Sequence, residues 1–149
     1  MVAYELIRFY NPLMNNNCLF CKIIAGEITC YKIWENDHFL AFLDIKPINL
    51  GHTLIVPKNH AEDLFDLSAE DRQGLGGAIQ EVASLVKIGT GADGINLGMN
   101  NGTVAGQLVF HAHLHIIPRF KGDGFKHWPG RENLMTDDFE AMQAKILAK

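Results

Sequence analysis

The sequence has no excess of positive charge, few cysteines and no long apolar run. It carries 13 Lys and Arg against 17 Asp and Glu, a formal net charge of −4 at pH 7. A surface dedicated to nucleic acid is usually strongly basic, so this charge argues against such a partner. Three cysteines do not suggest a disulfide framework, and no apolar run approaches the roughly 20 residues of a membrane helix. We therefore expect a cytoplasmic protein with no nucleic-acid or membrane partner.

The start of the chain also lacks the basic segment and continuous apolar core of a signal peptide. Residues 1–16 are a candidate disordered N-terminal extension, and Met14 is an alternative start. Residues 17–149 contain no repeat, low-complexity tract or linker. With 48% hydrophobic and 20% charged residues, they predict a single domain with a real core.

Hydrophobic periodicity and turn residues predict an α+β fold. Short β-rich runs occupy residues 31–35, 39–44 and 52–56, and two more strands are expected at 94–100 and 108–119. Ser68 opens a motif resembling a capping box before a helix that runs to about residue 88. Its expected core-facing stripe comprises Leu75, Ile79, Val82, Leu85 and Val86. Thr136-Asp137-Asp138 predicts the cap of a C-terminal helix. The result is an antiparallel sheet of about five strands with one long helix and a C-terminal helix.

Three histidines alternate with apolar residues in His111-Ala112-His113-Leu114-His115. On a β-strand they would share one face at intervals of roughly 7 Å. Burying them without partners is costly, so they are expected to face an anion or a metal. Imidazole suits phosphate chemistry, because one ring can attack phosphorus while others stabilise its oxygens. We favour a phosphate site; a metal site made of all three rings and an accidental surface grouping are the alternatives.

Two further patterns are weaker on their own. Asn100-Asn101-Gly102 and Ala105-Gly106-Gln107 form a polar, glycine-bearing loop whose amides could approach an anion, although most such loops are only turns. Cys18 and Cys21 have the spacing of half a tetrahedral zinc site, but two cysteines alone also fit a pair of buried thiols. Cys30 has no sequence partner and is interpreted as structural.

Together these residues resemble the histidine-triad (HIT) superfamily, in its Hint-like bacterial form, from about Asn17 to Arg119. The resemblance lies in the segment from Cys18 to Ile28, in Phe42-Leu43-Asp44, in the segment from Gly51 to Lys58, in Ala105-Gly106-Gln107, and in the histidine segment continued to Ile117. It implies a HIT-like fold and an enzyme without a catalytic metal, a nucleotide hydrolase or nucleotidyl transferase acting on nucleoside 5′-phosphoramidates or related nucleotides.

The resemblance also implies the role of each histidine. His113 would attack the α-phosphorus to form a nucleotidyl-histidine intermediate, from which water releases a nucleoside monophosphate. His115 and His52 would bind phosphate oxygens, and the backbone carbonyl of His111 would orient the His113 ring. Asn100 and the region of Gln107 would complete the phosphate and leaving-group contacts.

For the nucleoside, the resemblance implies that Asp44 accepts hydrogen bonds from the ribose hydroxyls. The base would lie in an apolar slot formed by Phe20, Ile23, Phe42 and Ile45; without the resemblance, Phe42 and Ile45 would be taken as ordinary core residues. The expected ligand is a purine nucleotide such as AMP. Leu108 departs from the pattern, because the phosphoramidase branch commonly has a serine there and leucine cannot donate a hydrogen bond.

By position, the resemblance adds His60 and the ring of His111 to Cys18 and Cys21 as ligands of a structural zinc. It also implies a homodimer, with Trp128-Pro129 in a C-terminal tail that reaches toward the partner. Two functional alternatives remain open at this point: a diadenosine-polyphosphate hydrolase, and a nucleotide-binding regulatory module with little turnover.

Overall fold

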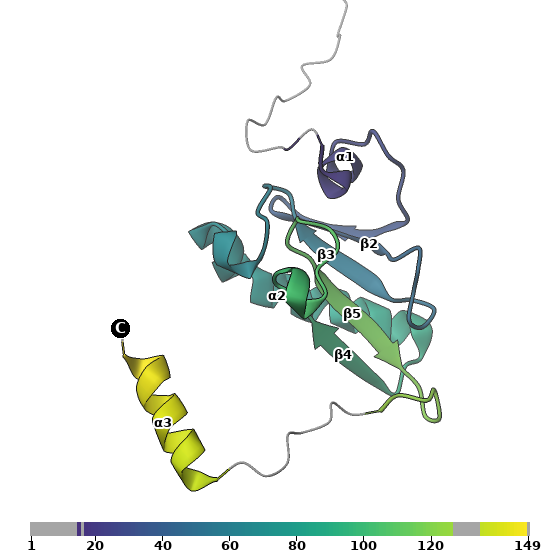
Figure 1. Cartoon of the computed structure of the whole chain (residues 1–149). Helices are drawn as coiled ribbons and strands as arrows, with labels where there is room; N and C mark the ends of the chain where they lie inside the picture. The colour runs from purple at the N-terminus through teal and green to yellow at the C-terminus, as the bar shows by residue number, and fades with distance from the viewer. Residues whose placement is uncertain (1–14, 16, 127–134, 149) are drawn as a thin grey trace, which may run out of the picture.

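The computed structural model describes residues 15, 17–126 and 135–148 of the chain. The predicted extension, apart from Asn15, and the Trp128-Pro129 segment lie outside these residues. Figure 1 shows the helices and strands in the order α1 (Leu19–Ile24), β1 (Lys32–Glu35), β2 (Phe39–Leu43), β3 (Thr53–Pro57), η1 (Leu64–Asp66), α2 (Ala69–Thr90), β4 (Gly94–Gly98), η2 (Thr103–Ala105), β5 (Leu114–Arg119) and α3 (Thr136–Leu147).

The five strands form one sheet in the order β1-β2-β3-β5-β4, and every neighbouring pair is antiparallel. This confirms the predicted α+β fold. The last strand is shorter than predicted, because β5 begins at Leu114 and residues 108–113 lie outside the ladder. His111 and His113 therefore precede the strand, and the expectation of three histidines on one strand face is wrong. Helix α1 was not predicted, because six residues are too few to show a helical period.

Helix α2 follows its predicted signals at both ends. The Ser68 hydroxyl accepts a hydrogen bond from the Asp71 amide at 3.0 Å, as an N-cap should. Gly91 ends the helix in the left-handed conformation with φ of 68°, which glycine adopts without steric cost. The predicted stripe is correct except for Leu85, which is 48% exposed. Ala78 takes that place in the core.

The two faces of the sheet are covered differently. Directly opposed residues of an antiparallel pair point to the same face, so the pairing assigns each side chain to a side. One face carries Phe39, Ala41, Ile55, Leu114 and Ile116, which pack against α2. On the other face α1 covers β2 and β3 through a second cluster, made of Cys18, Phe20, Cys21, Leu40, Phe42, Leu54 and Val56.

The part of this second face on β5 and β4 has a different composition. Here Gly98 pairs with His115, Asn96 with Ile117, and Gly94 with Arg119. Apart from Ile117, these are polar or small residues beside an apolar core, which is typical of a binding surface rather than of a packing surface.

Helix α3 lies apart from the sheet in Figure 1 and exposes Phe139, Met142, Ile146 and Leu147 on its surface. Among the described helices, none combines the length and apolar character needed to cross a membrane.

The core between α2 and the sheet predicts a stability difference between two valines. Val82 is completely buried there, whereas Val104 is fully exposed in η2. We expect Val82→Ala to lower the free energy of unfolding by about 2 kcal/mol, because buried methyl groups are lost and a cavity remains. Val104→Ala, the same chemical change on the surface, should alter it by less than about 0.5 kcal/mol. Urea unfolding followed by circular dichroism measures both, and equal effects would contradict this assignment of the core.

Candidate functional site

The His113 ring is oriented by its own chain. Its Nδ1 lies 2.7 Å from the carbonyl oxygen of His111, two residues earlier. A carbonyl can only accept, so Nδ1 carries the proton and Nε2 keeps an unshared electron pair. The Phe20 ring packs edge-on against His113, with ring centroids 5.2 Å apart, and holds it from the side of α1. The protein therefore fixes the orientation of the His113 ring, and in the neutral ring the unshared electron pair lies on Nε2.

Backbone contacts also determine the protonation of His52 and His115. Nδ1 of His52 accepts a hydrogen bond from the Ile48 amide at 3.2 Å. Its Nε2 must then carry the proton and donate it to Nδ1 of His115, 2.9 Å away. Nε2 of His115 consequently carries a proton. His113 and His115 lie side by side, with ring centroids 5.0 Å apart, so a nucleophilic nitrogen and a hydrogen-bond donor are adjacent.

Burial keeps this pair of rings neutral. Burial, together with the neighbouring His113 and His52, lowers the pKa of His115 to about 4. Burial also lowers the pKa of His52, although the nearby Asp44 carboxylate opposes that shift.

The residue before His52 must be glycine. The φ of Gly51 is +96°, and a Cβ there would meet the Thr90 side chain at 2.5 Å.

A second cluster joins α1 to the segment before β5. Nδ1 of His111 lies 3.4 Å from Sγ of Cys18, 3.6 Å from Sγ of Cys21 and 3.3 Å from Nδ1 of His60. Sγ of Cys21 is 3.4 Å from Nδ1 of His60. Tetrahedral zinc, with Zn–S bonds of about 2.3 Å and Zn–N bonds of about 2.05 Å, separates S from N by about 3.6 Å and N from N by about 3.3 Å. The four predicted ligand atoms therefore fit zinc.

The surroundings of this cluster favour a cation as well. Nε2 of His111 donates to the Pro57 carbonyl at 2.8 Å, which turns the unprotonated Nδ1 toward the two sulfurs. Burial lowers the pKa of His111 to about 4, so its ring is neutral, as a metal ligand requires. Burial raises the pKa of the Cys21 thiol to about 11, so the thiol keeps its proton until a metal ion displaces it. Among the described residues, one other group could hold a metal: Asp44, His52 and His115.

The predicted nucleoside residues lie on the α1 side of the histidines. Phe20 and Phe42 are buried and meet edge-on at 5.7 Å, and Ile23 packs against their cluster. Asp44 follows β2 and places Oδ2 3.7 Å from Nδ1 of His52. Ile45, unlike Phe20 and Phe42, is exposed over 82% of its surface.

The predicted phosphate loop divides into one exposed and one buried residue. Asn100 is exposed and lines a cavity beside His115. Gln107 is 2% exposed. Its Oε1 accepts a hydrogen bond from the Gly102 amide, and its Nε2 donates to the carbonyls of Glu62 and Val109. The Gln107 side chain therefore holds the loop in shape. Leu108 beside it is 90% exposed.

The cavity itself was not predicted from the sequence. Its volume is about 920 Å³, and it lies over β4 and β5. Besides His52, His115 and Asn100, its walls include Asn96, Arg119 and Lys126. One part of it could have been predicted, because the two-residue period of β5 places Arg119 on the same face as His115. The pairing of β5 with the strand that carries Asn96 could not be predicted from the sequence.

Residues 25–122 match the HIT domain family. Over 110 residues the chain is 47% identical to Protein hit of Bacillus subtilis, a match that covers 73% of this chain and 76% of the relative. It is 41% identical to the Arabidopsis thaliana adenylylsulfatase HINT3, covering 74% of this chain and 56% of that longer protein.

Solved structures show the same fold. A HIT family protein from Bacillus subtilis superposes with a TM-score of 0.81 at 41% identity, covering 88% of this chain and 95% of the other. A zinc-bound histidine triad family protein from Mycobacterium smegmatis gives a TM-score of 0.69 at 38% identity, covering 87% and 97%.

The neutral His115 ring predicts a pH dependence of stability. The unfolded histidine binds a proton near pH 6.5, but folded His115 binds one only near pH 4. Its contribution is therefore present above pH 6.5 and is lost as the pH falls through about 4. We expect the free energy of unfolding to fall less steeply between pH 7 and pH 4 in His115→Asn than in the parent, measured by urea unfolding. Val104→Asn, at a fully exposed position without a titrating group, is the control, and equal slopes in His115→Asn and the parent would contradict the buried neutral ring.

Proposed function

Because the chain belongs to the HIT domain family, we propose that it is a hydrolase or nucleotidyl transferase of nucleoside 5′-phosphoramidates or related nucleotides. The observation that carries this proposal is the 2.7 Å hydrogen bond from His113 Nδ1 to the His111 carbonyl. It leaves Nε2 as a nucleophile beside the proton-bearing His115.

In the first step, the electron pair on His113 Nε2 forms a bond to the α-phosphorus of the substrate. The bond from phosphorus to the leaving group breaks, and its electron pair departs with that group. The His113 ring then carries a positive charge, which the His111 carbonyl stabilises through Nδ1–H. Nε2–H of His115 donates to a phosphate oxygen, where negative charge accumulates in the transition state.

In the second step, water attacks the same phosphorus and the N–P bond breaks, so that its electron pair returns to Nε2. The proton lost by water passes to the departed group or to solvent. The sum of the two steps is one nucleotide and one water converted to a nucleoside monophosphate and the protonated leaving group. An acceptor other than water would give nucleotidyl transfer by the same route.

We place a purine nucleoside such as that of AMP on the α1 side of the histidines. Phe20, Phe42 and Ile23 would bound its base, and Ile45 would cover it from the exposed side. Asp44, at the end of β2, would accept from the ribose hydroxyls, and Asn100 from the loop would reach the phosphate. For Gln107 we propose an indirect contribution, because its side chain is used within the loop.

The name of the plant relative, adenylylsulfatase, supports hydrolysis at an adenylyl phosphorus. A diadenosine-polyphosphate hydrolase would use the same histidines with a larger leaving group. A binding module with little turnover is the remaining alternative, and the intact nucleophile at His113 argues against it.

We further propose that Cys18, Cys21, His60 and His111 hold a structural zinc. The donor distances fit the ion, and a similar protein from Mycobacterium smegmatis is zinc-bound. Zinc would tie α1 to His111, the residue whose carbonyl orients His113, and would take no part in the chemistry. The homodimer stays a prediction; the exposed apolar side chains of α3 and the edge strand β4 are surfaces that could form it.

The catalytic proposal is tested with adenosine 5′-phosphoramidate and diadenosine tetraphosphate as substrates. We expect AMP release from at least one of them, and His113→Ala should reduce it by at least about a thousandfold because the nucleophile is gone. AMP binding, measured by calorimetry, should persist in that variant. His38→Ala removes an exposed histidine outside the site and should leave turnover unchanged.

Two results would argue against the proposal. Unchanged turnover in His113→Ala would exclude it as the nucleophile. Tight AMP binding without AMP release from either substrate would instead support the binding module.

The zinc proposal is tested by the metal content of protein purified without chelator. We expect about one zinc per chain in the parent and in Cys30→Ser, and loss of that zinc in Cys18→Ser. Cys30 is the matched control, because it lies outside the four-residue cluster. Zinc retained in Cys18→Ser would point instead to Asp44, His52 and His115, and absence of zinc from the parent would refute both sites.

A further inference from the structure

The cavity over β4 and β5 lies next to the histidines, on the side away from α1. Its floor is the half of the second sheet face that α1 leaves uncovered. Gly98 lies opposite His115 in the ladder, and the space above it is open, since a Cβ at this position would meet no atom within 4 Å. A volume of about 920 Å³ is within the range of pockets that hold sizeable small molecules.

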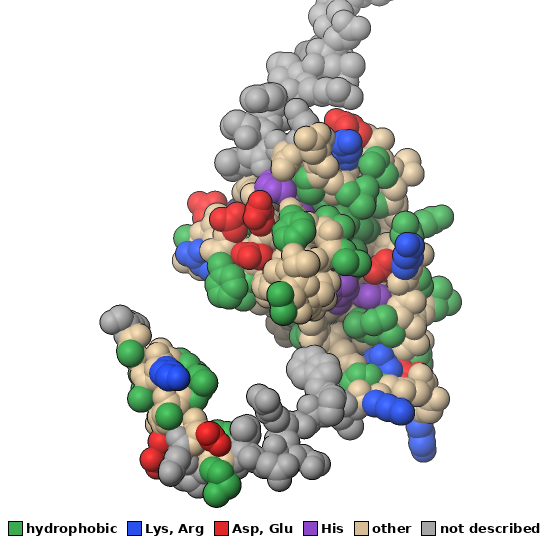
Figure 2. All heavy atoms as spheres, viewed as in Figure 1, with side chains coloured by type: hydrophobic (Ala, Val, Ile, Leu, Met, Phe, Trp, Pro, Cys, Tyr) green, Lys and Arg blue, Asp and Glu red, His purple; other side chains and the backbone are tan. Residues whose placement is uncertain are grey.

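The walls of this cavity suit an anion. They carry two permanent cations, Arg119 and Lys126, and one carboxylate, Asp123, beside the neutral His52 and His115. Figure 2 shows Lys and Arg side chains gathered around the loop after β5, below the exposed histidines. The net charge of the cavity is therefore positive in a protein whose overall charge is −4.

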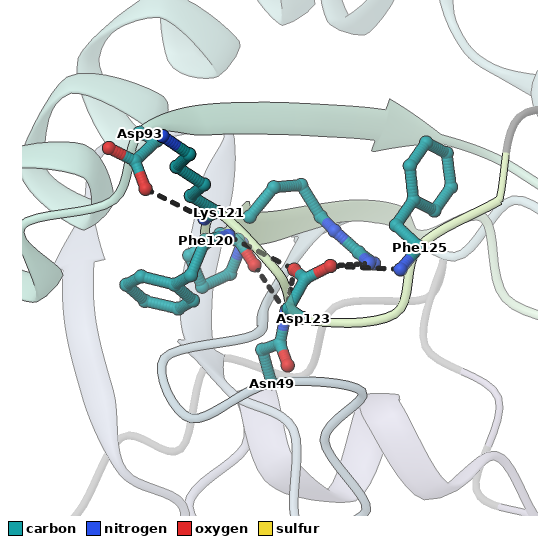
Figure 3. A network of polar contacts seen from close by, with 8 residues as sticks. Asn49, Asp93, Phe120, Lys121, Asp123 and Phe125 are labelled. Carbon is teal, nitrogen blue, oxygen red and sulfur yellow. Dashed lines mark hydrogen bonds and ion pairs between the residues drawn. The ribbon is translucent and has the colours of Figure 1, made fainter.

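The carboxylate of Asp123 is already fully occupied. As Figure 3 shows, it accepts hydrogen bonds from Asn49 Nδ2 at 2.9 Å, from the amides of Phe120 and Phe125 at 3.0 Å, and from Arg119 at 2.7 Å. These donors hold its pKa well below the ordinary range. Asp123 therefore shapes the loop, and its charge is compensated by groups that remain in place when a ligand arrives.

Donor groups remain at the wall. The described residues give the Arg119 guanidinium one hydrogen-bonded nitrogen, the one that binds Asp123, while its Nε is buried without a partner. The donor of the Asn96 amide is Nδ2, which has no hydrogen-bond partner among the described residues, whereas its Oδ1 is a buried, unpartnered acceptor. Arg119 stacks on the Phe125 ring at 4.3 Å, which fixes the guanidinium in place.

The position of these groups defines what they can reach. Arg119 is four residues beyond His115 on the same face of β5, which at 3.3 Å per residue is about 13 Å. An ammonia-sized leaving group at His115 would not extend that far. A chain of several phosphates would run along the strand from the histidines toward Arg119.

We propose that Asn96, Arg119 and Lys126 form a subsite for the phosphate chain of the leaving group and favour substrates that carry one. This inference rests on the proposed nucleotidyl chemistry at His113 and adds the specificity-determining residues. The nucleoside lies toward α1, the reacting phosphorus lies at the histidines, and the departing chain lies over β4. When the bond from the α-phosphorus to the bridging oxygen breaks, the electron pair leaves on that oxygen, and the cations of the subsite stabilise the added charge.

The test compares kcat/KM for diadenosine tetraphosphate with kcat/KM for adenosine 5′-phosphoramidate. Lys126→Gln and Asn96→Asp should each lower the ratio of the two by roughly three- to tenfold, because each removes one favourable charge contact or adds a repulsive one. Lys121→Gln is the matched control: the same charge is removed from the same exposed loop, but outside the cavity walls. A ratio that is unchanged in both cavity variants, or that falls equally in the control, overturns the subsite.

A binding measurement separates failure of the subsite from failure of the catalytic proposal. Inorganic tripolyphosphate is titrated by calorimetry into protein saturated with AMP, which occupies the nucleoside side. Binding that weakens severalfold in Lys126→Gln and Asn96→Asp but not in Lys121→Gln supports the subsite, even if no AMP is released from either substrate. No binding to the AMP-loaded parent overturns it, whereas AMP release in the same preparation would leave the chemistry at His113 intact.

Discussion

A hydrogen bond between two residues of one short segment, from His113 Nδ1 to the His111 carbonyl, governs the chemistry available to this fold. It can form only while the His111 carbonyl and the His113 ring are both held in place. Three different parts of the fold hold residues 111–114 in place. Nε2 of His111 bonds Pro57 at the end of β3, the Ala112 amide bonds the Ala61 carbonyl, and β5 begins at Leu114. The proposed nucleophile, His113, is thus oriented by backbone groups next to the sheet rather than by an acidic side chain.

The same reasoning gives the three histidines different functions. Each ring has one nitrogen bonded to a group that fixes its proton: His111 to Pro57, His113 to His111, and His115 to His52. The remaining nitrogens differ accordingly: Nδ1 of His111 faces the sulfurs, Nε2 of His113 makes no backbone contact, and Nε2 of His115 carries a proton.

The sequence predicted the parts of this arrangement that depend on local patterns. Periodicity located the strands and α2, Ser68 marked the helix start, and alternation around His113 indicated a phosphate site. The errors arose where tertiary context decides. β5 starts only at Leu114, because the residues before it contact other parts of the chain. The Ala112 amide donates to the Ala61 carbonyl and the His111 ring contacts Cys18, so neither residue pairs with a neighbouring strand. The cavity depends on the register of β4 against β5, which pairs Asn96 with Ile117, and no local motif specifies that pairing.

The incomplete cover of the second sheet face has a consequence for the order of events in a turnover. In a double displacement, water must approach the phosphorus from the side opposite the histidine nitrogen, which is the side from which the first product has just departed. If the chain uses the proposed double displacement, the open hollow over β4 would be the exit for the first product and then the entrance for water, while the nucleoside stays on the α1 side. The first product would have to leave the hollow before water could reach the intermediate. A product that stayed in the space above Gly98 would favour return to substrate, and a product that left would favour hydrolysis.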